Sequence, residues 1–236
     1  MKYRSCLVAS VFAVLGAIGA NAATITYEFT GGSLTPTLSG VPAGVTASNF
    51  GVGALGLFDN GGGPDSLRFF ATDVGGASGT ALSNNQYVQF SVTIAAGTVV
   101  NFTSLSLDYT STVPLANLSN TRVFSSIDAF NQIAEDTVGT LGKAANGVAG
   151  PINNSMSLSA PEGNAGRGTN VTNGEFTALT NTTVTFYMPW IDNETGNTYT
   201  DVDNIRLTFD IVPEPSSLLL GAIGVLPFLR RARKVP

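Results

Sequence analysis

The sequence predicts an all-β protein whose central part is an antiparallel β-sandwich of the jelly-roll type, with an apolar segment outside the fold at each end. Three observations lead to this prediction. Several short segments alternate apolar and polar residues, clusters rich in glycine, asparagine and aspartate separate them, and no segment has a sustained helical stripe of apolar residues. The best helical candidate, from Ser126 to Ala134, is short.

The alternating segments have a period of two, which places all their apolar side chains on one face of an extended strand. We therefore expect half-buried strands with one face in a core and the other in water. The apolar positions are Ile25, Tyr27 and Phe29; Val88, Phe90, Val92 and Ile94; Leu105, Leu107 and Tyr109; Val184, Phe186, Met188 and Trp190; and Ile205, Leu207, Phe209 and Ile211.

The segments between these strands have the composition of turns and loops. Clusters such as residues 59–65 and 75–79 contain glycine with aspartate, asparagine, serine or proline. The stretch from Gly139 to Gly174 is rich in glycine, alanine and asparagine, and it predicts a long loop or insertion. We expect residues 192–203 to form a hairpin turn with several carboxylates.

The N-terminal segment has the pattern of a secretory signal peptide. Lys2 and Arg4 precede an apolar run from Cys6 to Ile18, and the small residues Ala20 and Ala22 follow it. This pattern predicts that residues 1–22 are removed by signal peptidase after Ala22. An uncleaved anchor is the alternative, but about 13 apolar residues are fewer than the roughly 20 that a spanning helix needs.

The C-terminal segment combines Pro213-Glu214-Pro215, an apolar run from Leu218 to Leu229, and a basic cluster. The cluster consists of Arg230, Arg231, Arg233 and Lys234. Basic residues beside an apolar segment stay on the cytoplasmic side, so the rest of the chain is expected outside. About 12 helical residues reach only about 18 Å, less than a hydrocarbon core of about 30 Å, which favours a transient span. An amphipathic or buried terminal helix is disfavoured because the segment is apolar on every side and ends in charge.

Residues 213–236 resemble the PEP-CTERM sorting signal of Gram-negative bacteria, with the motif, the apolar sorting helix and the basic end in the right order. The resemblance implies processing by an exosortase, a membrane enzyme that acts near Pro213-Glu214-Pro215. It also implies delivery to the cell surface or extracellular matrix, in association with exopolysaccharide and biofilm or floc. Pro227, near the end of the apolar run, departs from the usual pattern.

Residues 23–212 are long enough for one substantial core, and we expect one domain. Broken pieces of this region resemble galactose-binding-like or carbohydrate-binding-module jelly rolls; they are residues 77–80, 87–92, 104–108 and 125–130, and Asp203-Asn204-Ile205. The resemblance implies that the strand containing Asp203-Asn204-Ile205 pairs near the first strand.

The charged residues of the central region are mostly acidic. The chain has 11 basic and 16 acidic residues, but six of the basic ones and only one acidic one lie in the terminal segments. The central region therefore has a net charge of about −10, which disfavours nucleic acid as a partner. It contains neither histidine nor cysteine, because the one cysteine is Cys6. Disulfides, thiolate nucleophiles, Ser-His-Asp triads and Cys/His zinc sites are thereby excluded.

Structural calcium is the one cofactor that the acidic residues suggest. The turn with Asp192, Glu194, Asp201 and Asp203 offers oxygen ligands, and so does a pair formed by Glu28 on the first strand with Asp203. Asp59 and Asp65 are a third option. Acidic turns are also common simply because they are soluble, so this alternative stays open.

Tyr87 and Tyr187 are candidates for stacking on sugar rings, because they fall on the polar phase of their strands and should reach solvent. Trp190 falls on the apolar phase and should lie in the core. Packing within the protein is the alternative role for both tyrosines.

The function expected from these observations is non-enzymatic. The chain would be an exported protein of a Gram-negative surface or matrix that scaffolds or binds exopolysaccharide, with signal peptidase, exosortase and, through its tail, the inner membrane as partners. Its C-terminus would be cytoplasmic until processing. A secreted carbohydrate-active enzyme that uses a carboxylate pair and a calcium-stabilised coat protein are the alternatives.

Overall fold

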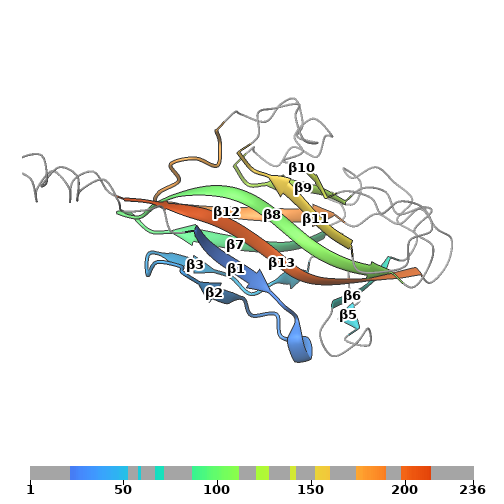
Figure 1. The fold of residues 1–236 in the computed structure, drawn as a ribbon. Coiled ribbons are helices and arrows are strands. Elements are labelled where there is room, and N and C mark those ends of the chain that lie inside the picture. Colours follow the sequence, from blue (N-terminus) through green and yellow to red (C-terminus); the bar gives the residue numbers. More distant parts are fainter. Residues whose placement is uncertain are drawn as a thin grey trace, which may run out of the picture.

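The computed structural model describes residues 22–52, 58–59, 67–71, 87–111, 121–127, 139–141, 152–159, 174–189 and 198–213. Within these ranges the protein is an all-β sandwich of two antiparallel sheets (Figure 1). The only helix in them is a single 3-10 turn, η1 (Thr30–Gly32). In the part of the chain so described, no helix is long and apolar enough to cross a membrane.

The first sheet is organised around its two longest strands, which pair with each other over most of their length. Two short strands extend it, because β6 also pairs with β13 and β5 pairs with β6. In spatial order the main path is β11 (Ile152–Ser157), β8 (Val99–Ser111), β13 (Thr198–Val212), β1 (Ala22–Tyr27) and β2 (Thr37–Ser39), and the additional strands are β6 (Leu67–Ala71) and β5 (Phe58–Asp59).

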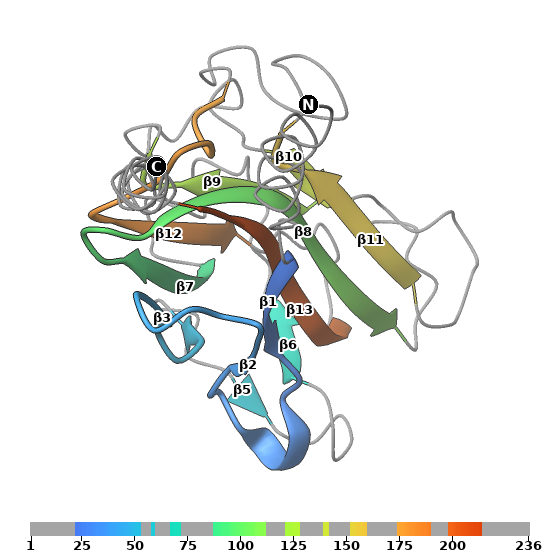
Figure 2. The ribbon, with the colours of Figure 1, turned by 60° about the vertical axis from the view of Figure 1, so that its left-hand side comes forward.

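The second sheet packs against the first, and Figure 2 shows the two layers from a second angle. Its centre is the pairing of β12 with β7, which runs from Thr182 opposite Ile94 to Pro189 opposite Tyr87. In spatial order its strands are β10 (Gly139–Leu141), β9 (Thr121–Ser125), β12 (Thr182–Pro189), β7 (Tyr87–Ile94) and β3 (Val45–Ala47), with β4 (Gly51–Val52) also paired to β7.

The predicted strand faces are confirmed. Every apolar position in the alternating segments whose side chain is described is at most 2% exposed, apart from Ile211, which packs partly buried against the core. The side chains of Tyr109 and Trp190 lie outside the described set. Alternation therefore identified the core side of these strands correctly.

Aromatic rings connect the two sheets inside the core. The ring centroids of Tyr27 on β1 and Phe90 on β7 are 5.2 Å apart, and those of Phe102 on β8 and Phe186 on β12 are 6.0 Å apart. Within the first sheet, Phe102 and Phe209 lie at 5.9 Å. Such pairs contribute about 0.5–1.5 kcal/mol beyond their buried area.

The loop predicted from Gly139 to Gly174 is wrong in part, because this stretch contains β10 and β11. β11 pairs with β8, and Met156 and Leu158 are buried. Residues 155–160 alternate serine with Met156, Leu158 and Ala160, but the composition on both sides is that of a loop. The sequence analysis gave more weight to this context than to the alternation.

The hairpin predicted across residues 192–203 is also wrong. β12 belongs to the second sheet and β13 to the first, so the chain crosses the sandwich between them. Alternation shows which side of a strand is buried, but it does not show which sheet contains the strand. Of the predicted helix, only Ser126 and Ile127 are described, and they form a turn after β9.

Candidate functional site

A pair of carboxylates lies on the outer side of the first sheet. Asp108 on β8 is directly opposite Asp203 on β13, where the register of the two strands shifts. Asn204 has a left-handed backbone there, with φ of 49°. Its side-chain nitrogen donates hydrogen bonds to Asp108 Oδ2 at 3.0 Å and to Asp203 Oδ2 at 3.1 Å. One amide group is therefore shared by two carboxylates.

The backbone completes this arrangement. The Asn204 backbone N–H donates to Asp203 Oδ1 at 2.7 Å. Asparagine enters the left-handed region more readily than most residues, because its short polar side chain can bond locally. We call Asp108, Asp203 and Asn204 the Asn204 cluster.

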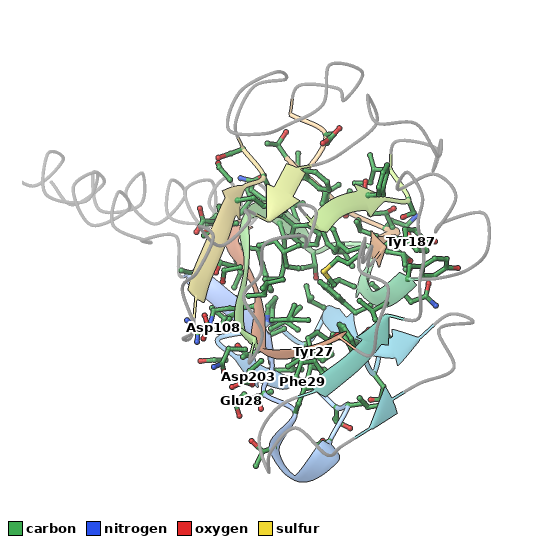
Figure 3. All side chains as sticks on the ribbon, turned by 90° about the vertical axis from the view of Figure 1, so that its right-hand side faces the viewer. Tyr27, Glu28, Phe29, Asp108, Tyr187 and Asp203 are labelled. Atoms are coloured by element: carbon green, nitrogen blue, oxygen red, sulfur yellow. The ribbon has the colours of Figure 1, made fainter. Side chains whose placement is uncertain are left out.

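Glu28 is exposed and lies near the Asn204 cluster. It follows Tyr27, which is paired with Ile205, and β1 is therefore beside β13 as the resemblance implied. Figure 3 shows Glu28, Asp108 and Asp203 on one side of the molecule and Tyr187 on the other. Among the described residues, no three Asp, Glu, His or Cys side chains come together in a group suited to a metal ion.

The other predicted calcium ligands are not placed by the structure. Asp192, Glu194 and Asp65 lie outside the described residues, while Asp59 and Asp201 are described only as parts of β5 and β13. Calcium binding stays a prediction. The sequence reasoning did not select Asp108, although its position on the polar phase after Leu107 was visible. Its proximity to Asp203 depends on a strand pairing that the sequence does not state.

Two tyrosines lie on the outer side of the second sheet. Tyr87 on β7 and Tyr187 on β12 are half-buried, and their rings meet edge to face with centroids 5.3 Å apart. Phe124 on β9 is directly opposite Tyr187 and so occupies the same face, but it is 1% exposed. The tyrosines lie on the side predicted from their phase, while their role in stacking stays a prediction.

Hydroxyl pairs continue along this side of the second sheet. Ser91 Oγ and Thr185 Oγ1 are 2.7 Å apart, and Thr93 Oγ1 and Thr183 Oγ1 are 2.9 Å apart. Each pair joins β7 to β12 at directly opposite positions. The face therefore has an aromatic end and two rows of hydroxyl groups.

The two predicted processing sites lie beside neighbouring strand ends. Ala22, the predicted cleavage position, begins β1 and is opposite Asp210 on β13. β13 ends at Val212, and the exposed Pro213 follows it. The remaining residues of both signals lie outside the described ranges: Ala20, Glu214, Pro215, Arg230, Arg231, Arg233 and Lys234.

No protein-family model and no curated protein matches the chain. Among solved structures, the chain is similar to the K1 cleaved adhesin domain of Lys-gingipain from Porphyromonas gingivalis W83. The alignment covers 81% of this chain and 98% of that one at 13% identity, with a TM-score of 0.29. A similarity at this level supports no transfer of function.

Proposed function

We propose that the chain is an exported surface or matrix protein of a Gram-negative bacterium, with no enzymatic activity of its own. In this proposal signal peptidase removes residues 1–22, an exosortase processes the tail at Pro213-Glu214-Pro215, and the sandwich between them scaffolds or binds exopolysaccharide. The tail anchors the chain transiently in the inner membrane until it is processed.

The observation that carries the proposal is the agreement between the predicted tail and the end of the last strand. β13 ends at Val212 and the exposed Pro213 follows it, so the strand stops at the residue before the predicted motif. A signal that is removed must lie outside the hydrogen-bonded core of the domain it delivers. The end of β13 meets this requirement, while Ala22, the last residue of the predicted leader, is the first described residue of β1.

The topology supports the jelly-roll part of the proposal. Among the described strands, the chain changes sheet between β2 and β3, β4 and β5, β6 and β7, β7 and β8, β8 and β9, β10 and β11, β11 and β12, and β12 and β13. Repeated crossing between two antiparallel sheets is how a jelly roll is wound.

Intact mass spectrometry of the protein from producing cells tests the proposal. With an active exosortase, we expect a mass that lacks residues 1–22 and part or all of the tail. Without the enzyme, the whole tail should remain. Replacing Glu214 with alanine should have the same effect, and Glu175→Ala within the sandwich is the matched control. A mass that is the same with and without the enzyme would refute the proposal.

A calcium-stabilised coat protein is a second candidate, favoured by the Asn204 cluster and by Glu28 nearby. Two carboxylates at directly opposite positions of an antiparallel pair repel each other unless a donor or a cation lies between them. Asn204 supplies one donor to this pair. Calcium binding by Glu28 and Asp203 would add to that stabilisation.

A further inference from the structure

The outer side of β7 and β12 forms one continuous strip of uncharged polar side chains. We call it the outer β7–β12 face and define it by Tyr87, Ser91, Thr93, Thr183, Thr185 and Tyr187. Each of these side chains is half-buried or exposed. Gln89 occupies the remaining outward position of β7 and is also uncharged. From Tyr87 to Thr93 the strip extends about 20 Å along the strand.

The hydroxyl pairs on this face retain hydrogen-bonding capacity. When two hydroxyls share one bond, one of them donates and the other accepts, which leaves one O–H donor and several lone pairs for each pair. Threonine is stiff at χ1, and the cross-strand bond holds it further. The face therefore offers donors and acceptors in fixed rows. Ligand hydroxyls, which also donate and accept, would bind there with a small loss of side-chain freedom.

The tyrosines give the same face an apolar end. Tyrosine has an apolar ring and a polar tip, which suits partners that combine C–H surfaces with hydroxyls. The edge-to-face contact between Tyr87 and Tyr187 supports both rings. Phe124 on β9 lies opposite Tyr187 but is 1% exposed, so the accessible aromatic end consists of the two tyrosines. Rings and hydroxyl rows together match a polymer of sugar rings.

Charge decides between classes of polysaccharide. No described side chain on the outward positions of β3, β7 and β12 is charged, whereas the outer side of the first sheet has Glu28, Asp108, Arg206 and Asp210. The chain has a net charge of −5. A net acidic protein repels an anionic polymer, and this face has no described cation to compensate. An uncharged polymer meets no such repulsion.

We propose that the outer β7–β12 face binds an uncharged polysaccharide chain lying along the two strands. This inference rests on the proposed function, to which it adds the binding surface and the class of polysaccharide. The rings contact the faces of the sugars, and the hydroxyl rows exchange hydrogen bonds with their hydroxyl groups.

Affinity electrophoresis of the full chain tests the inference. The gels contain dextran, galactomannan or soluble β-1,3-glucan as uncharged probes, and alginate as the anionic probe. At least one uncharged probe should slow the protein, and alginate should not. The double variant Tyr87→Ala/Tyr187→Ala should weaken that binding at least tenfold. The double variant Ser106→Ala/Thr208→Val, on the outer side of the first sheet, should leave it unchanged.

A second variant protects the test against loss of folding. If the tyrosine variant loses its cooperative melting transition, Ser91→Ala/Thr185→Val is measured instead, because it removes the hydroxyls with almost no change in volume. It should weaken binding severalfold. The inference is overturned if no uncharged probe binds, if alginate binds equally well, or if a folded face variant binds like the original chain.

The result of the affinity electrophoresis can be separated from the result of the mass measurement. A chain that loses its tail to exosortase but binds no uncharged polysaccharide would contradict the inference and leave the export proposal intact. A chain that binds through this face but keeps its tail in the presence of the enzyme would contradict the export proposal and leave the inference intact.

Discussion

The Tyr27 hydroxyl on β1 donates a 2.7 Å hydrogen bond to the backbone carbonyl of Ser48, the residue that follows β3 in the opposite sheet. The Tyr27 side chain is buried, and its ring also lies 5.2 Å from that of Phe90. Ser48 is in turn bonded to Ser91 on β7, through its backbone N–H and its hydroxyl. Tyr27 thus links the first sheet to the edge of the second by packing and by a polar contact.

Replacing Tyr27 with phenylalanine should remove the polar contact and preserve the packing. We expect the free energy of unfolding to fall by about 1–2 kcal/mol, because the Ser48 carbonyl loses its donor in a partly buried place. Urea denaturation followed by circular dichroism measures this difference. Thr46→Val on the exposed side of β3, which also removes one hydroxyl, is the control and should change stability by less than about 0.5 kcal/mol. Equal losses for the two variants would refute this role for Tyr27.

The same tyrosine should make stability depend on alkaline pH. Burial raises the pKa of Tyr27, and the hydrogen bond to Ser48 opposes this shift only in part. In the unfolded chain the group loses its proton near pH 10. Above that pH the folded state binds more protons than the unfolded state, so the free energy of unfolding falls as pH rises, by up to about 1.4 kcal/mol per pH unit from this group.

Denaturation midpoints between pH 8 and pH 11 measure this dependence. Stability should be level below about pH 9.5 and should fall above it, and Tyr27→Phe should fall less steeply than the original chain. Parallel slopes for the two proteins would show that other groups cause the alkaline loss.

The Asn204 cluster provides a test that separates side chain from backbone. Asn204→Gly keeps the left-handed conformation accessible but removes the amide that Asp108 and Asp203 share. We expect a loss of about 1–3 kcal/mol in the free energy of unfolding. Asn204→Ala should lose about 1 kcal/mol more, because alanine is strained at a positive φ. If glycine is as stable as asparagine, the shared amide contributes nothing.

Calcium should raise the melting temperature if Glu28 and Asp203 bind it. A calcium concentration of about 100 times the dissociation constant adds about 2.7 kcal/mol of stability, which corresponds to several degrees for a chain of this size. Asp203→Asn should abolish the increase, whereas Asp210→Asn on the same strand should preserve it. A melting temperature that is indifferent to calcium and to EDTA would remove calcium from the proposal.

Phe186 should be among the most sensitive core positions. Its ring lies 5.2 Å from that of Phe90, 6.0 Å from Phe102 and 5.7 Å from Phe176, between the two sheets. Phe186→Ala should cost about 3–5 kcal/mol through lost burial and the cavity that remains. Thr183→Ala, on the outward side of the same strand, should cost at most about 1 kcal/mol, through loss of its hydrogen bond to Thr93. Calorimetry of both variants compares the two sides of β12 directly.

The sequence was most informative where apolar residues alternate over several positions. From Val88 to Ile94 each second residue is buried, since pairing on both sides fixes the strand and one face meets the other sheet. It was least informative about β11, where a short alternating segment from Ser155 to Ala160 lies in a loop-like composition. A strand of that kind forms because β8 offers it a partner, and this partner is distant in sequence.

The two candidate sites also differ in how far the local sequence pattern predicts them. The phase of Tyr87 and Tyr187 within their strands placed both on the outside, since period two is a local property. The meeting of Asp108 with Asp203 required knowledge that β8 pairs with β13, and the role of Asn204 required its left-handed backbone. Neither follows from the local pattern, because residues 108 and 204 are 96 positions apart.

The pairing of Ala22 with Asp210, close to the end of β13 at Val212, also determines how an exported sandwich would be suspended. Both connections to a membrane would leave from the same end of the sandwich, because β1 begins beside the end of β13. After cleavage at Ala22, the tail would still hold this end of the sandwich towards the membrane. Only cleavage beyond Pro213 would release the domain.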